Sequence, residues 1–325
     1  MTMRWTQPLI SAVLAATTVW LAPVASAQSY PNKPITIVVP FGPGSGTDQM
    51  ARVVAQGLGD ALKVPVVVDN KGGASGFIAA QYVAKSTPDG YTLMMTTNTT
   101  QSANEHLFKK LPYDPVKDFT PITLLATGQM LLLVRPDSPY KTQADLIAAA
   151  KKAPGKLNFG AGSSSSQVAS ELLKQMANID AVYVPYKSNP LAITDLFGGQ
   201  IDFMFADAPT AVPQVQGGKL RALSASGSKR LSATPDVPTV EQAGVKGYDM
   251  GYWFAVYGPA GMPAALVQQL NQTLAKVAKG EAFSNTLAKT SGELALSTPE
   301  GLTQFQAEDS KKWGKVIRAA GIEPQ

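Results

Sequence analysis

Short apolar runs alternate with longer amphipathic stretches near the start of the chain, and this alternation restricts the fold more than any other feature. Residues 35–39, 64–68 and 91–96 are rich in β-branched and apolar side chains, as buried strands are. Helical patterns at about 48–58 and 77–84 separate these runs. Strand, helix, strand, helix, strand is typical of a mainly parallel sheet with helices on both faces. The sequence therefore predicts an α/β fold.

A second unit repeats this arrangement after a loop over residues 113–121 and a predicted crossing strand near Ile122. Its strands are predicted at 131–134, 158–159, 182–184, 201–205 and 220–223, with helices that end at Asn178 and cover 190–197. This second alternation predicts another sheet flanked by helices.

The rest of the chain is expected to return to the first unit. Residues 252–257 form one more predicted strand, and the pattern from Ala264 to Ile322 is almost wholly helical. Helices without strands of their own need a sheet to cover, and the first sheet is the best candidate. We therefore expect two lobes with a ligand cleft between them. One lobe comprises residues 28–127 and 255–325, and the other comprises residues 128–254.

The amino-terminal segment predicts export. Arg4 is the only charged residue before an apolar run over residues 9–24, which leads into small residues up to Ala27. This composition is typical of a secretory signal peptide, here residues 1–27, cleaved after Ala27. A retained membrane anchor is the alternative, but a span needs roughly 20 apolar residues and the run is shorter. No cysteine follows that could carry a lipid, so we expect a free periplasmic protein.

The composition excludes several classes of site. The chain has no cysteine, which removes disulfides, thiol nucleophiles and thiolate metal sites, and its single histidine is His106. A Ser-His-Asp triad or a histidine metal site would depend on that one residue, so we predict no metal and no cofactor. Loss of Arg4 with the signal lowers the formal net charge from +5 to +4, from 27 basic and 23 acidic residues. The basic residues are scattered, which argues against nucleic-acid binding and favours encounter with small anions.

The glycine-rich segment from Phe41 to Asp48 is the sharpest local motif. It joins the first predicted strand to a helix, at the sheet edge where open α/β folds bind ligands. Glycines let backbone N–H groups turn toward an anion, and the helix amino-terminus adds a positive dipole end. The candidate ligand-binding residues here are Gly44, Ser45, Gly46, Thr47 and Asp48. The alternative is a tight turn in which Asp48 only caps the helix.

Nucleotide and hydrolase motifs do not fit the chain. Thr47 stands where a dinucleotide fingerprint has its third glycine or alanine, and no Gly-Lys-Ser/Thr of a Walker loop follows. Gly-x-Ser-x-Gly, which would indicate a hydrolase nucleophile elbow, is missing from the sequence.

Similar polar segments follow the other predicted strands. A second glycine-rich turn offers Gly73, Ala74, Ser75 and Gly76, and the third strand ends in Thr97 and Asn98. The second unit offers Ser163, Ser164, Ser165 and Ser166 at a helix start, and Tyr186 and Asp207 after strands. The alternative is that these serines only cap the helix, but an N-cap needs just one of the four hydroxyls. Asp207 is placed equally well to accept a hydrogen bond from a ligand and to cap the helix that follows it.

Taken together, these motifs resemble the Bug family, the periplasmic receptors of tripartite tricarboxylate transporters. The resemblance covers essentially the whole mature chain and rests on the order and spacing of its motifs. These are Tyr30-Pro31, Pro34-Ile35, Phe41–Asp48 with Ala51-Arg52, Val68–Asn70 with the glycines to Gly76, Pro88–Leu93, Val184–Lys187, Gly198–Asp202, Pro238-Thr239 with Glu241, and Gly258–Gly261 with Pro263. The chain departs from the family pattern at Ser45, Tyr183 and Ser188-Asn189.

The resemblance implies a two-lobed, venus-flytrap binding protein without catalytic activity that captures a small carboxylic acid. In the family, the two glycine-rich loops hold a carboxylate through backbone amides and ordered water, and the matching positions here are 44–48 and 73–76. Ser163–Ser166 and Asp207 would line the other lobe. The departures lie beside this expected pocket, which also offers no obvious arginine for a second carboxylate. The ligand is therefore open among di-, tri- and aromatic carboxylates.

The implied partners are this ligand and the membrane permease subunits of a tripartite tricarboxylate transporter, and we expect a monomer. Two alternatives remain at this point. The protein could signal to a sensor kinase instead of feeding a transporter, or it could be an exported hydrolase or lyase that uses Asp207, His106 or Asp48.

Overall fold

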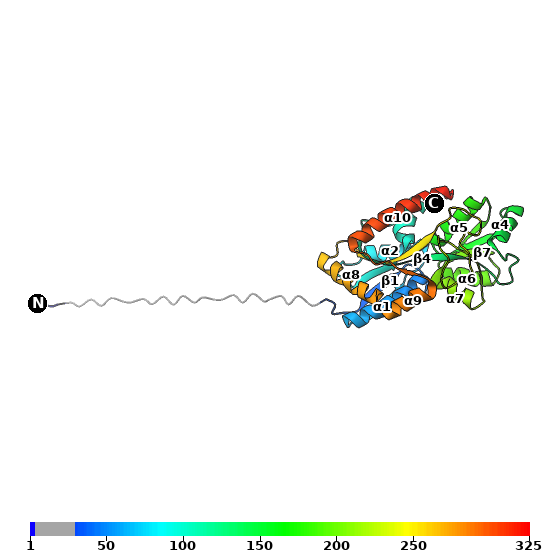
Figure 1. Cartoon of the computed structure of the whole chain (residues 1–325). Coiled ribbons are helices and arrows are strands. Elements are labelled where there is room, and N and C mark those ends of the chain that lie inside the picture. Colours follow the sequence, from blue (N-terminus) through cyan, green and yellow to red (C-terminus); the bar gives the residue numbers. More distant parts are fainter. Residues whose placement is uncertain (4–29) are drawn as a thin grey trace.

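The structure is a computed structural model that describes residues 1–3 and 30–325. The predicted signal peptide and its cleavage site after Ala27 lie outside the described residues. The described part is an α/β protein in two lobes, seen side by side in Figure 1. None of its helices combines the length and the hydropathy that a bilayer crossing needs.

The first lobe contains the parallel sheet predicted from the alternation. Its strands are β1 (Ile35–Val39), β2 (Val66–Asn70) and β3 (Thr92–Thr96), in the order β2-β1-β3, with α1 (Gly46–Leu62) and α2 (Phe77–Ala84) as the crossover helices. Strand alternation sends side chains to opposite faces of the sheet. Ile37 accordingly packs in the apolar cluster that includes α1, whereas Val38 packs in the cluster that includes α2.

Two long antiparallel strands connect the lobes. They are β4 (Phe119–Val134) and β9 (Gly251–Pro259), called the crossing strands below, and their pairing runs from Phe119 opposite Pro259 to Gln129 opposite Gly251. The sequence pattern predicts separate strands near Ile122 and over 131–134, and this is wrong because β4 is continuous. The polar residues Thr127-Gly128-Gln129 interrupted the apolar pattern between the two predicted strands. Pro121, which cannot donate to a ladder, lies near the start of β4 at a shift in register.

The second lobe has a sheet of its own, which contains both parallel and antiparallel strand pairs. Its strands are β5 (Asn158–Ala161), β6 (Val182–Pro185), β7 (Phe203–Asp207) and β8 (Arg221–Ala225). β7, β5 and β6 are parallel neighbours, while the carboxyl-terminal part of β4 pairs antiparallel with both β7 and β8. The helices are α4 (Gln143–Lys152), α5 (Ser164–Ala177), α6 (Asn189–Phe197) and α7 (Ala208–Gln216).

The carboxyl-terminal helices pack on elements of the first lobe and also touch the second. Helix α8 (Ala264–Ala278) packs on α1 and β4, and α10 (Pro299–Ala319) packs on β4. Helix α9 (Glu281–Thr290) contacts α7, and α10 reaches α5, so both helices link the lobes. Figure 1 shows α10, in red, extending along one edge of the molecule toward α5. A short strand between α9 and α10, β10 (Glu293–Leu294), pairs with β4 and was not predicted.

Three short elements follow strands of the first lobe. They are η1 (Ala74–Gly76), a π-helical turn η2 (Thr99–Ala103) and α3 (Asn104–Leu107). Every residue of η2 is buried, although all but Ala103 have polar side chains. This segment therefore needs hydrogen-bond partners inside the molecule.

Candidate functional site

The loop from Phe41 to Asp48 is fixed by its own hydrogen bonds. Ser45 is the N-cap of α1, and its Oγ accepts from the backbone N–H of Asp48 at 3.2 Å. Asp48 Oδ2 in turn accepts from the backbone N–H of Gly44 at 2.8 Å. The first bond satisfies an amide group that a helix start leaves without a partner, and the second ties the residue before the N-cap to the helix.

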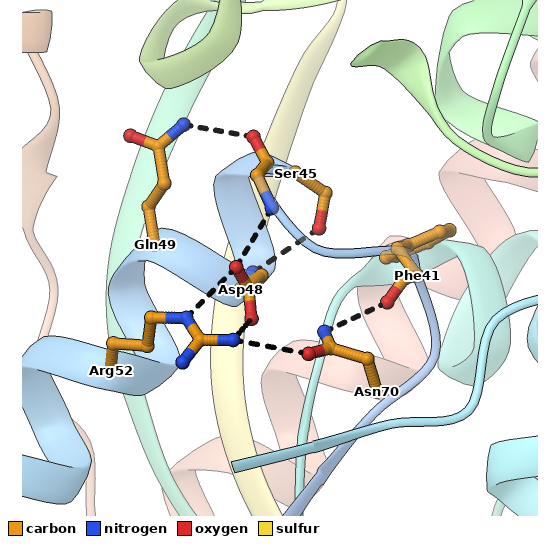
Figure 2. A network of polar contacts seen from close by, with 7 residues as sticks. Phe41, Ser45, Asp48, Gln49, Arg52 and Asn70 are labelled. Carbon is orange, nitrogen blue, oxygen red and sulfur yellow. Dashed lines mark hydrogen bonds and ion pairs between the residues drawn. The ribbon is translucent and has the colours of Figure 1, made fainter. Parts of the chain in front are cut away.

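A polar network anchors this loop to the neighbouring strand (Figure 2). Arg52 pairs with both oxygens of Asp48, at 3.1 Å through Nε and 3.0 Å through Nη2. Arg52 also donates to Asn70 Oδ1 at 3.3 Å, and Asn70 Nδ2 donates to the carbonyl of Phe41 at 3.0 Å. Burial would raise the pKa of Asp48, but the hydrogen bonds from Arg52 and Gly44 outweigh it and the pKa is lowered. Asp48 therefore positions the loop as an ionised group.

The two lobes meet around a small space, called the inner cavity, of about 30 Å³. The first lobe contributes Phe41, Ser45, Gly46, Thr47 and Thr97, and the second contributes Ser163, Ser165, Asn189 and Asp207. The crossing strands contribute Met130, Tyr252 and Phe254. Residues 45–47 bring the amino-terminus of α1 to this space, and a helix amino-terminus attracts anions. The arrangement suits a small anionic group surrounded by hydroxyl and amide hydrogen-bonding groups.

Asp207 is the acidic group of the inner cavity. Asn189 Nδ2 donates to its Oδ1 at 2.5 Å, and Thr210 Oγ1 donates to its Oδ2 at 2.7 Å. Asp207 occupies the N-cap position of α7, but its side chain does not cap the helix backbone there. Burial raises the pKa of Asp207 despite the hydrogen bonds from Thr210 and Asn189. The protonated carboxyl is therefore favoured more strongly here than in water.

A second, larger space of about 250 Å³, called the outer cleft, shares Phe41 and Ser163 with the inner cavity. Ser75 and Gly76 of the second glycine-rich turn line it from the first lobe. Tyr183, Pro185, Tyr186 and Lys187 line it from the second lobe. The Tyr186 hydroxyl donates to Asp195 Oδ2 at 2.7 Å, which fixes the ring as part of the wall.

Serine hydroxyls at the start of α5 join the lobes directly. Ser164 Oγ donates to Asn104 Oδ1 at 2.8 Å, and Ser165 Oγ donates to Asn98 Oδ1 at 3.0 Å. All four side chains are buried. Ser163 instead caps α5 by accepting from the backbone N–H of Ser166. A cavity of 30 Å³ has room for only about one or two waters, so a larger molecule can enter only when these contacts separate.

The predicted site residues divide among three places. Ser45, Gly46, Thr47, Thr97, Ser163, Ser165 and Asp207 line the inner cavity. Ser75, Gly76, Ser164 and Tyr186 line the outer cleft. Gly44, Asp48, Gly73, Asn98 and Ser166 do not figure among the described residues that line either space, and Ala74 lies within η1. The two glycine-rich turns thus face different spaces in this arrangement of the lobes.

Several lining residues were not among the predicted site residues. Strand alternation places Tyr252 and Phe254 on the cavity side of β9, where both also belong to the main apolar cluster. Asn189 connects three groups: its Oδ1 accepts from Ser166 Oγ at 2.9 Å and from the Gly162 N–H, and its Nδ2 holds Asp207. The sequence signal that could have identified Asn189 is the departure from the family pattern at Ser188-Asn189.

The groups that a hydrolase or lyase would need do not converge. His106 lies on α3, where its Nε2 is 3.0 Å from Ser310 Oγ and its ring packs against Gly314 of α10. Asp48 is engaged by Arg52, and Asp207 faces the inner cavity. The described residues also include no cluster of histidine and acidic side chains that could hold a metal.

Residues 50–322 match the family model described as "Tripartite tricarboxylate transporter family receptor". The chain belongs to this family. The receptor is 32% identical to the protein BugT of Bordetella pertussis over 312 residues, 95% of each chain. Its structure resembles that of Rpa4515 of R. palustris with adipate, with a TM-score of 0.88, 33% identity and coverage of 91% of this chain and all of the other.

A further similar structure is MatC of Rhodopseudomonas palustris with bound malate. Its TM-score is 0.84 at 31% identity, covering 89% of the receptor and all of MatC. Such matches along most of the chain confirm the two-lobed periplasmic-binding-protein fold that the resemblance implied. The family consists of solute-binding receptors, so the receptor is assigned to this class.

Substituting Gly46 tests whether the inner cavity forms by closure of the lobes. A Cβ at this position would lie 2.0 Å from Asp207 Oδ2, although the backbone there is ordinary helix. Gly46→Val should therefore leave each lobe folded and weaken carboxylate binding by roughly two orders of magnitude or more, which corresponds to about 3 kcal/mol. Isothermal titration calorimetry measures the loss. Gly301→Val, in the first turn of α10, is the matched control, and unchanged affinity in Gly46→Val would contradict the prediction.

The raised pKa of Asp207 predicts how stability depends on pH. Between the ordinary value of 3.8 and the raised value, the folded state keeps a proton that the unfolded state has released. Stability therefore falls as pH rises through this window, by at most ~1.4 kcal/mol per pH unit. The Asp207→Asn variant has no carboxyl group at this position, so its stability lacks this dependence on pH. The melting temperature of the variant minus that of the wild type should therefore increase with pH through the window and then level off. Asp309, whose pKa burial also raises, is present in both proteins and cancels. A difference that is flat from pH 4 to 8 would contradict the assignment.

Proposed function

We propose that the receptor captures a small di-, tri- or aromatic carboxylate between its lobes and delivers it to the permease subunits of a tripartite tricarboxylate transporter. One observation carries the proposal: the amino-terminus of α1 and the polar side chains of the second lobe face a single cavity. The similar proteins Rpa4515 and MatC, whose structures contain adipate and malate, support a carboxylate as the ligand. The receptor would act as a monomer in the periplasm, after removal of residues 1–27.

Each part of the cavity has a role in this proposal. The backbone N–H groups of Gly46 and Thr47 hold a ligand carboxylate at the helix start, where the dipole favours it, whereas the Ser45 N–H is donated to the Gly42 carbonyl. The Ser163 hydroxyl faces the same space and can add a further hydrogen bond, whereas Thr97 and Ser165 line the cavity with their protons donated to Asn98 Oδ1. Asp207 would not repel the ligand when protonated, and its O–H would donate to a carboxylate oxygen. Burial, which raises the pKa of Asp207, supports this role.

Closure of the lobes supplies the signal to the transporter. We take residues 28–127 with 255–325 as one moving body and residues 128–254 as the other, joined by the crossing strands. A ligand that contacts both bodies favours the closed arrangement by its differential affinity for it. The hydrogen bonds from Ser164 and Ser165 to the first lobe add to the stability of the closed form.

A thermal-shift panel tests the ligand class. The mature protein, stripped of carried-over ligand, would be screened against citrate, C4–C6 dicarboxylates, acidic amino acids, nicotinate, benzoates and phthalates. A ligand at about one hundred times its dissociation constant stabilises the folded state by about 2.7 kcal/mol. For a protein of this size, we expect the melting temperature to rise by about 2–4 °C per kcal/mol. A flat panel, repeated with amides of the same acids to detect neutral ligands, would contradict the proposal.

Removing one hydroxyl tests the contribution of closure to affinity. Ser164→Ala leaves Asn104 Oδ1 without its donor from the second lobe, but only when the lobes are closed. Carboxylate affinity should fall by about 1 kcal/mol, roughly fivefold. Ser170→Ala is the matched control, because Ser170 Oγ donates within α5, to the carbonyl of Ser166. Equal affinities for the two variants would show that Ser164 does not hold the closed form.

A further inference from the structure

A further pocket lies on the opposite side of the crossing strands from the inner cavity. This space, called the rear pocket, has a volume of about 420 Å³. Strand alternation explains the two sides: Tyr252 and Phe254 project toward the inner cavity, whereas Trp253 projects toward α10, where its ring meets Phe305 at 5.7 Å. The rear pocket is within the range of small-molecule sites, about 300–1,000 Å³.

Both lobes and the crossing strands contribute to the rear pocket. The crossing strands supply residues 127–129 and 250–253, and α10 supplies the opposite wall with Phe305, Asp309 and Trp313. Trp253 and Trp313 are among the lining residues and are 2% and 3% exposed, so packing fixes the positions of both rings. Trp253 Nε1 donates to Asp309 Oδ2 at 2.7 Å, which sets the carboxylate beside the two rings.

The charged residues of the rear pocket favour a cation. Four acidic side chains line it, Asp249, Glu293, Glu308 and Asp309, against two lysines, Lys229 and Lys312. Lys312 Nζ lies 3.9 Å from Asp249 Oδ2 and its charge also acts on Asp309, so four carboxylates share two ammonium groups. Burial raises the pKa of Asp309, which means that its negative charge lacks full compensation by the protein. A bound cation would supply that compensation.

We propose that the rear pocket is a second binding site, for a small organic cation that carries an ammonium group on an apolar body. Aromatic rings beside carboxylates are the chemistry that recognises alkylammonium groups. The inner cavity, with its helix amino-terminus and hydroxyls, selects the opposite charge. Apart from Tyr252, which contributes to both spaces, the proposal concerns different residues from the carboxylate site, and it does not depend on that site's function.

The sequence supplies a selective probe of this site. Trp5 and Trp20 lie in the predicted signal peptide, so the mature protein would contain only Trp253 and Trp313, both in the rear pocket. Tryptophan emission of the mature protein, with no carboxylate added, should change saturably on titration with choline. The neutral isostere 3,3-dimethylbutan-1-ol should bind about tenfold more weakly or not at all, and matched additions of KCl should have no effect.

Two variants test the residues. Glu308→Gln with Asp309→Asn keeps the side-chain shapes and an acceptor for Trp253, and should weaken choline binding by about tenfold. Glu293→Gln, at an exposed position, should weaken choline binding less. Because this substitution does not alter the buried part of the pocket, it tests the proposal even if the double variant fails to fold. Glu300→Gln is the control, since Glu300 is on α10 but outside the pocket. The proposal is overturned if choline leaves the emission unchanged, if the isostere binds equally, or if neither acidic variant differs from the control.

Discussion

The pairing of β4 with β9 is the interaction on which the rest of the structure depends. These strands are hydrogen-bonded to each other through the region between the lobes. The carboxyl-terminal part of β4 also pairs with β7 on one edge and β8 on the other, and the middle of β4 pairs with β10. The link between the lobes is thus a two-stranded ribbon and not a pair of flexible loops. Relative motion of the lobes has to bend or twist this ribbon, so the motion is restricted to a few directions.

The same ribbon separates two chemical environments. Tyr252 and Trp253 are adjacent in sequence but project to opposite faces, one toward the inner cavity and the other toward α10. The face toward the inner cavity meets a helix amino-terminus and hydroxyl groups, which favour anions. The face toward α10 meets carboxylates and aromatic rings, which favour cations. A molecule bound on either face would act on the same two strands, so the sites share the element that moves.

The loops of the first lobe were predictable, because glycine-rich turns at the carboxyl ends of parallel strands follow from local pattern alone. Ser45 and Gly46 were identified in this way. Contacts between the lobes were not predictable, since the partners of Ser164 and Ser165 are Asn104 and Asn98, about sixty residues away in sequence. The continuity of β4 was also missed. Polar residues in its middle and Pro121 near its start break the apolar run that identifies a buried strand.

The position of β9 in the sheet has a consequence for how the chain folds. The order β3-β9-β4 places a strand from residues 251–259 between two strands that precede it by more than one hundred residues. The first lobe therefore cannot complete its sheet until the intervening chain has been made and brought back. Residues between β4 and β9 form a contiguous unit that can condense earlier and hold the two strands in register. Such non-local closure is slow, so an incomplete first lobe would expose the edges of β3 and β4 to aggregation while it waits for β9.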